Sequence, residues 1–152
     1  MEAPAKIRPK SLADYLEVMS KSVFQAGISW KVVESKWPGI KEAFREFDPV
    51  AISKLTANEI NELAQDSRII RNHGKIEAVV GNARRMLELD RSHGGFAKYP
   101  RSFPSFDELT KDLRKQFKFL GDMGTYHFLW IVNEKVPSWE EWSSQHMTRA
   151  RN

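Results

Sequence analysis

Residues 120–125 form a glycine-containing segment whose backbone could bind a phosphate group. Gly121 and Gly124 interrupt two helical patterns, and a turn of this kind can point successive backbone N–H groups outward. The helix that follows adds the positive end of its dipole. This pattern is typical of a helix–hairpin–helix motif, which grips a DNA backbone without reading the bases. The predicted phosphate clamp consists of Gly121, Asp122, Met123, Gly124 and Thr125.

A basic stripe leads into this turn along the preceding helical pattern. Its members recur at positions i, i+3, i+4 and i+7, and they are Lys111, Arg114, Lys115 and Lys118. Cations at this spacing lie on one helix face, where they can attract a polyanion. The alternative interpretation is a tight turn between two helices with a solvated basic face.

The segment Gln25-Ala-Gly-Ile-Ser-Trp30 predicts a second kind of contact. A large aromatic residue just after a glycine turn can stack on a planar ligand, which suits Trp30. The turn itself can push a small apolar residue such as Ile28 into a gap between stacked bases. Trp30 as an ordinary core residue is the alternative interpretation.

A third segment, Arg71-Asn-His-Gly-Lys75, places potential cations around a glycine break. Arg71 and Lys75 are candidates for phosphate contacts. The alternative is a capped helix end with a solvated rim.

Helical signals must position these segments, and strand alternation bounded by hairpin turns is not evident. The fold class expected is therefore all-α, a compact helical domain with a helix–hairpin–helix motif. Capping residues and apolar periodicity predict helices from Ser11 to Gly27, over 29–36 and 39–47, from Pro49, from Thr56, over 74–89, from Ser105, and over 125–133.

Composition sets the outer limits. The chain has 152 residues, no cysteine and a net charge of +4, so disulfides and thiolate-dependent zinc or iron–sulfur sites are excluded. No apolar run approaches the roughly 20 residues that span a bilayer. We expect one domain over residues 11–152 after a flexible segment at 1–10. We also expect a cytoplasmic monomer without membrane contact.

Five short motifs occur in a characteristic order along the chain. They are Gln25-Ala-Gly-Ile-Ser-Trp30, Phe47-Asp-Pro-Val50, Ile69-Ile-Arg-Asn-His-Gly-Lys-Ile76, Gly81-Asn-Ala-Arg84 and Phe117-Lys-Phe-Leu-Gly121. Together they resemble the bacterial 3-methyladenine DNA glycosylase I family of the helix–hairpin–helix superfamily, from about Leu16 to Asn133. The resemblance implies a nucleoid-associated enzyme of base-excision repair. Such an enzyme flips an alkylated adenine out of double-stranded DNA and hydrolyses its N-glycosidic bond.

Roles follow from the resemblance for individual residues. Trp30 would be the base-stacking platform, in a pocket shared with Ser22 and Gln25. Residues 121–125 would form the phosphate clamp. The wedge that fills the abasic gap would be Ala26, Gly27 and Ile28, with further phosphate contacts from Lys118, Lys75 and Arg71.

The chain also departs from the family pattern. Ser22 stands where the family has a pocket glutamate, and a hydroxyl cannot offer a full negative charge to a cationic base. The family's pocket tyrosine and its stretch resembling His-Asp-Asn-Glu-Trp-Gly have no counterpart among the 152 residues. The family's structural zinc is expected to be absent, because the chain lacks cysteine and because His127 and His146 show no zinc-ligand pattern. No metal or other cofactor is expected.

Glu140 is the remaining catalytic candidate. Many superfamily members place a catalytic aspartate after the helix that follows the hairpin, and Pro137-Ser-Trp-Glu140 stands in roughly that place. Glu140, or Glu141 beside it, would stabilise an oxocarbenium-like transition state or activate water. The alternative is a surface helix capped by Ser138.

Two other functions are compatible with these features. One is a catalytically silent DNA-binding relative that keeps the wedge and the clamp. The other is a helical protein-interaction module, which leaves the hairpin and the basic stripe unexplained.

Overall fold

The computed structural model describes residues 5–151, with side chains up to His146. Every regular element in that part of the chain is helical, which confirms the all-α prediction. The α-helices are α1 (Leu12–Gln25), α2 (Trp30–Ala43), α3 (Pro49–Ser53), α4 (Ala57–Gln65), α5 (His73–His93), α6 (Phe106–Gln116), α7 (Asp122–Ile131) and α8 (Trp139–Arg151). Short 3₁₀ turns are η1 (Arg45–Phe47), η2 (Phe96–Lys98) and η3 (Pro100–Ser102). No helix among the described residues is long and apolar enough to cross a membrane.

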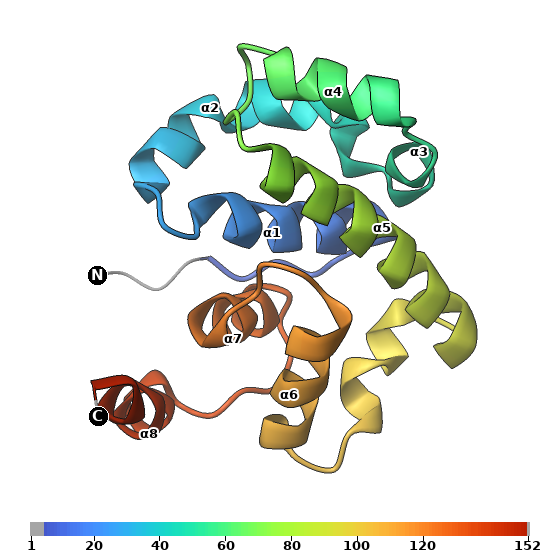
Figure 1. The fold of residues 1–152 in the computed structure, drawn as a ribbon. Helices are drawn as coiled ribbons and strands as arrows, with labels where there is room; N and C mark the ends of the chain where they lie inside the picture. The colour runs from blue at the N-terminus through green and yellow to red at the C-terminus, as the bar shows by residue number, and fades with distance from the viewer. Residues whose placement is uncertain (1–4, 152) are drawn as a thin grey trace.

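Helices α1 and α5 form the centre of the molecule. Figure 1 shows α2, α3 and α4 on one side of this pair and α6, α7 and α8 on the other. The apolar stripe predicted for α5 is buried, with Ile76, Val79, Ala83 and Met86 all inaccessible to solvent. This long helix therefore contacts α3 and α4 on one side of the molecule and η2 on the other.

Most predicted helix starts are confirmed by their caps. Thr56 and Glu59 form a reciprocal capping box at α4, and Ser105 accepts a hydrogen bond from the Glu108 N–H at α6. Asp48 caps α3, whose first residue is Pro49. The side chain of Ser11 does not cap α1, although the helix starts beside it as predicted.

Helix α2 corrects the prediction of two separate helices with a break at Trp37-Pro38-Gly39. It continues through Pro38 to Ala43, although proline lacks the N–H that the ladder uses. Burial on both sides of Pro38 offsets this loss, because Val33, Trp37 and Ile40 lie in the core. The helix ends before η1, whose residues have positive φ values of 54° to 56°.

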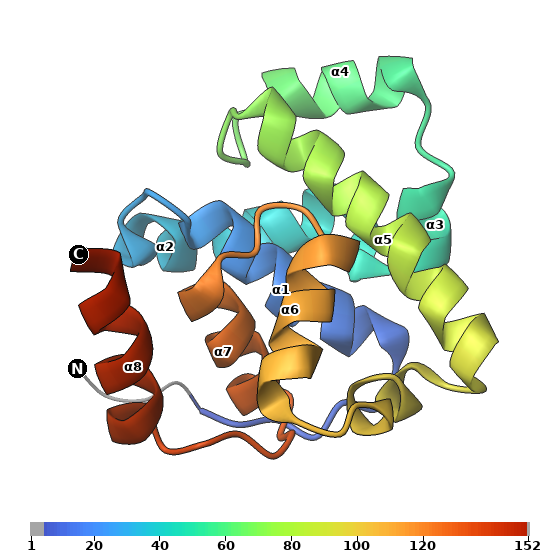
Figure 2. The ribbon, with the colours of Figure 1, turned by 60° about the horizontal axis from the view of Figure 1, so that its bottom comes forward.

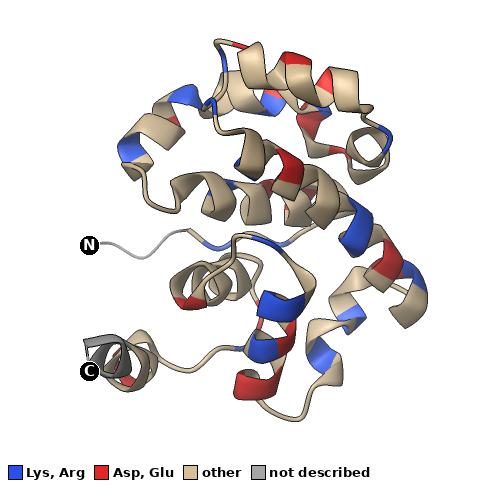
Figure 3. Ribbon diagram, viewed as in Figure 1, with Lys and Arg blue, Asp and Glu red and all other residues tan. Residues whose placement is uncertain are grey.

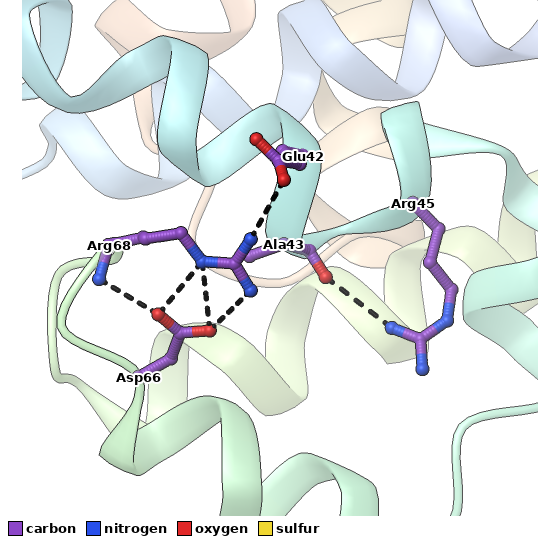
Figure 4. A network of polar contacts seen from close by, with 5 residues as sticks. All are labelled: Glu42, Ala43, Arg45, Asp66 and Arg68. Atoms are coloured by element: carbon purple, nitrogen blue, oxygen red, sulfur yellow. Dashed lines mark hydrogen bonds and ion pairs between the residues drawn. The ribbon is translucent and has the colours of Figure 1, made fainter.

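Gly39 also has a packing role that a helix break does not explain. A Cβ atom at this position would lie 3.2 Å from the Cβ of Arg68, in the segment that joins α4 to α5. The absence of a side chain lets this segment approach α2 closely. Figure 4 shows the result: Arg68 bonds Asp66 and also pairs with Glu42 of α2.

Candidate nucleic-acid interface

The loop between α1 and α2 has the shape predicted for a wedge. Gly27 has a φ of +76°, and the Ile28 N–H donates to the Gln25 carbonyl at 3.2 Å to close the turn. A Cβ on Gly27 would meet nothing within 4 Å, so the backbone conformation and not a lack of space calls for glycine. Ala26 and Gly27 are exposed and Ile28 is half-buried.

Lys75 corrects the prediction of a phosphate contact. Its side chain is only 5% exposed, and its ammonium group donates to the carbonyl oxygens of Phe24 at 3.3 Å and Ala26 at 2.5 Å. Burial lowers the pKa of this ammonium group. A cation at the C-terminal end of α1 also complements the helix dipole. Lys75 therefore holds the wedge loop from beneath.

The turn between α6 and α7 lies at the predicted hairpin but is shorter than predicted. Helix α7 begins at Asp122 and not at Thr125, so Gly124 lies within its first turn. The left-handed residue of the hairpin is Phe119, with a φ of 60°, whereas Gly121 has an ordinary φ of −83°. Phe119 is half exposed, and so is Met123. The α7 helix leaves the N–H groups of its first turn without intrahelical acceptors. These groups are the ones available to an anion.

Two members of the predicted clamp behave differently from the expectation. The Thr125 N–H donates to the Gly121 carbonyl at 2.9 Å, so it is used within the turn. The Thr125 hydroxyl is fully buried and has no hydrogen-bond partner among the described residues. Asp122 forms an ion pair with Arg114, which offsets its negative charge at a site proposed for phosphate. Figure 3 shows the basic residues of α6 leading toward this turn.

Asn82 fixes the entry to the hairpin, a role that sequence reasoning missed. The buried amide of Asn82 donates to the Lys118 carbonyl at 3.2 Å and accepts from the Lys118 N–H at 2.8 Å. The signal was available, because an asparagine within the apolar stripe of a long helix needs hydrogen-bond partners. The side chain of Lys118 remains exposed, as a phosphate contact requires.

The three predicted segments converge on one surface. A methyl group on Gly74 would lie 3.8 Å from the Phe119 ring, and one on Gly124 would lie 3.8 Å from the Ser22 Cβ. Lys75 joins the start of α5 to the wedge loop in the same region. We call this surface, formed by residues 22–30, 70–75 and 118–124, the loop face.

Trp30 lies at the edge of the loop face and not in the core. It is 51% exposed at the first position of α2, so the alternative interpretation of Trp30 as a core residue is wrong. Ser22 and Gln25 are half-buried on α1. An exposed indole can stack on a base, and a hydroxyl or an amide can hydrogen-bond the edge of a base.

The structure favours the alternative interpretation of Glu140. Ser138 accepts a hydrogen bond from the Glu141 N–H at 3.2 Å, so α8 starts as a capped helix with Glu140 exposed in its first turn. Glu141 lines a cavity of about 170 Å³ with Phe106 and Trp142, and this cavity includes neither Ser22 nor Trp30. In Figure 2 the first turn of α8 lies at the end of that helix remote from α2.

The two histidines considered for zinc have aromatic neighbours. His127 stacks on Trp139 at 5.6 Å between ring centroids, and His146 stacks on Trp142 at 4.5 Å. Burial lowers the pKa of His127. The absence of zinc stays a prediction.

An all-helical chain that gathers an apolar wedge, an exposed tryptophan and a basic hairpin on one face has the architecture of a helical DNA glycosylase. The comparisons with known proteins agree. A family model described as methyladenine glycosylase matches residues 9–120. The protein belongs to the methyladenine glycosylase family.

Individual relatives give the extent of the similarity. The chain is 32% identical over 136 residues to DNA-3-methyladenine glycosylase 1 of Escherichia coli K12, covering 74% of this chain and 73% of that one. It is 33% identical over 126 residues to DNA-3-methyladenine glycosylase of Haemophilus influenzae, covering 69% and 68%. The solved structure of 3-methyladenine DNA glycosylase I from Staphylococcus aureus matches with a TM-score of 0.73 and 26% identity, covering 84% of this chain and 79% of that one.

Proposed function

We propose that the protein is a DNA glycosylase that releases an alkylated base, with 3-methyladenine as the first candidate, from double-stranded DNA. The observation that carries this proposal is that the hairpin approaches both Ser22 on α1 and the start of α5, the two elements that hold the wedge loop, and that the residue after this loop is the exposed Trp30. The family relatives are named for 3-methyladenine, and the Staphylococcus aureus structure is described as showing the basis of 3-methyladenine recognition. The proposed partner is a damaged duplex in the bacterial cytoplasm, bound by one copy of the chain.

The proposed roles follow the geometry. The N–H groups of Asp122, Met123 and Gly124 bind a phosphate of the damaged strand, with Lys118 beside them. Ala26, Gly27 and Ile28 fill the gap that the flipped nucleotide leaves. Trp30 stacks on the flipped base while Ser22 and Gln25 face its edge.

The chemistry asks little of the protein when the base is already cationic. Cleavage of the N-glycosidic bond returns the bond electrons to the base and neutralises it, while a water oxygen adds to the sugar carbon and releases a proton. Ser22 can hydrogen-bond an adenine edge but cannot act as an anionic base. Stacking, desolvation and positioning therefore supply the rate enhancement.

A second candidate, binding without catalysis, is favoured by two observations. The position that carries a carboxylate in the family pattern is Ser22, and Glu140 faces solvent. Such a protein would recognise damaged DNA and leave the glycosidic bond intact.

Base release separates the two candidates. Duplex oligonucleotides carrying alkylated, deaminated or oxidised bases are incubated with an excess of the full chain, and free base is measured by chromatography. Release of an alkylated adenine is the expected result. Tight binding to the same duplex with no free base after long incubation would establish the silent relative instead.

A further inference from the structure

A hollow lies beside the wedge loop, and no residue of the hairpin lines it. Its volume is about 370 Å³. Four apolar residues line it, which we call its floor: Ile28, Val32, Ile69 and Ile70. The polar lining residues, which we call its rim, are Lys36, Ser67 and Arg71. Ile28 therefore belongs both to the wedge and to this hollow. No carboxylate lines it.

The hollow is lined by Ile28 of the wedge, whereas the hairpin approaches α1 before the wedge. The hairpin packs near Ser22 of α1, whereas the hollow opens between α2 and the segment at residues 66–72. The start of α5, directly after this segment, reaches the hairpin, because a Cβ atom on Gly74 would lie 3.8 Å from the Phe119 ring. A duplex whose damaged strand lies on the hairpin would present its other strand toward the hollow.

The rim of the hollow is ordered by a polar network. Arg68 bonds Asp66 at 2.7 Å and pairs with Glu42 at 3.4 Å, as Figure 4 shows. Lys36 donates to the Ser67 carbonyl at 3.4 Å, which ties α2 to the same segment. Arg71 forms no ion pair with a described residue and is exposed. Two cations thus lie beside an apolar floor, and the nearby Asp66 is already paired with Arg68.

We propose that this hollow receives the complementary strand of the duplex. This proposal rests on the proposed function. The unpaired base opposite the flipped nucleotide lies on the apolar floor, and Arg71 and Lys36 contact its flanking phosphates. The minor groove is only about 6 Å wide, so an apolar side chain that enters it lies close to both strands. Ile28 therefore contacts the base opposite the flipped nucleotide. The positive charges of Lys36 and Arg71 complement the negative charges of the DNA backbone.

Binding to single-stranded and duplex DNA tests this assignment. The probe is a labelled oligonucleotide with a tetrahydrofuran abasic analogue, alone or paired with its complement. The test variant is Lys36→Gln/Arg71→Gln. The control is Lys54→Gln/Arg91→Gln, which removes the same charge from exposed positions at the ends of α3 and α5.

The test variant is expected to bind the duplex about tenfold more weakly and the single strand within about twofold of the wild type. The control is expected to change both affinities less than about twofold. An equal loss for single strand and duplex would place the two cations on the damaged strand and overturn the proposal. An unchanged duplex affinity would also overturn it. Base release by the wild type is measured separately, so either failure leaves the proposed function standing.

The floor of the hollow is tested by the opposite base. Duplexes with a normal nucleotide or a second abasic analogue opposite the first are compared. The wild type is expected to prefer the normal nucleotide several-fold, and Ile70→Ser is expected to lose that preference. The same preference in the wild type and in Ile70→Ser would contradict the proposal that the opposite base binds on this apolar floor.

Discussion

The loop face and the α7–α8 end of the molecule use aromatic and polar side chains in opposite ways. Beneath the loop face, Lys75 and Asn82 are buried and bond backbone groups, while Trp30 and Phe119 on the face are exposed. At the α7–α8 end the rings stack on one another, with Tyr126 and Trp142 at 4.7 Å and both buried. The first arrangement leaves apolar surface ready for a ligand, and the second holds α8 in place.

This difference separates binding from stability. Substitutions on the loop face should change DNA binding more than folding, and substitutions at the α7–α8 end should do the reverse.

Trp30→Ala is expected to have the largest effect on DNA. Loss of base stacking costs about 1–3 kcal/mol, so the single-turnover rate of base release should fall about tenfold to hundredfold. Trp139→Ala is the matched control, because Trp139 is a 40% exposed tryptophan on α8. Single-turnover rates of both variants check the prediction. An equal loss of rate in Trp30→Ala and Trp139→Ala would show that the effect of Trp30 does not depend on its position on the loop face.

Lys75→Met is expected to weaken binding to an abasic duplex about tenfold or more. The variant leaves the carbonyls of Phe24 and Ala26 without their donor, at a cost of about 1–3 kcal/mol, and so releases the wedge loop. Titration of labelled duplex measures the affinity, and urea unfolding measures stability. Lys54→Met, at an exposed position, should change neither. A variant that loses stability but keeps its affinity would show that Lys75 serves folding alone.

Asn82→Ala is expected to have a smaller effect, about fivefold to tenfold on affinity. It removes two hydrogen bonds to the Lys118 backbone and loosens the hairpin entry, which Leu120 and Phe117 still anchor in the core. The salt dependence of binding should become shallower at the same time, since fewer phosphates are engaged. Asn58→Ala, on the exposed side of α4, is the control. An unchanged salt slope would argue against the role of Asn82 in the clamp.

The smallest expected effect is a loss of folding stability in acid that arises from His127 at the α7–α8 end. Burial lowers the pKa of His127, so the unfolded chain binds a proton at a higher pH than the folded chain does. The free energy of unfolding contributed by His127 is therefore present above its ordinary pKa of about 6.5 and falls as the pH drops toward the lowered value. Urea unfolding between pH 7.5 and 5 should show a smaller acid-induced loss for His127→Gln. An identical loss would contradict the sign.

Local signals predicted much of the fold and the position of the site. Capping residues and apolar spacing gave the starts of α3, α4 and α6, and the glycine turns marked the wedge and the hairpin. These features depend on residues a few positions apart, which sequence reasoning can read.

Long-range contacts explain what the sequence did not predict. Helix α2 passes through Pro38 because its core residues hold it on both sides. Lys75 is buried because two carbonyls at the end of α1 meet it, and neither partner is near it in sequence. The local cap at Ser138 offered a surface helix as one of two interpretations of Glu140, and the packing of α8 on the rings of α7 accompanies the structure that favours it.

The central claim is that the wedge and the hairpin act as one DNA-binding face that favours a flipped or missing base. Its most direct test is the affinity of the full chain for an abasic-analogue duplex and for an intact duplex across salt concentrations. The predicted result is tighter binding of the abasic duplex, with log K falling against log salt at a slope of about −2 or steeper. Equal affinity for both duplexes, or a flat response to salt, would contradict the account.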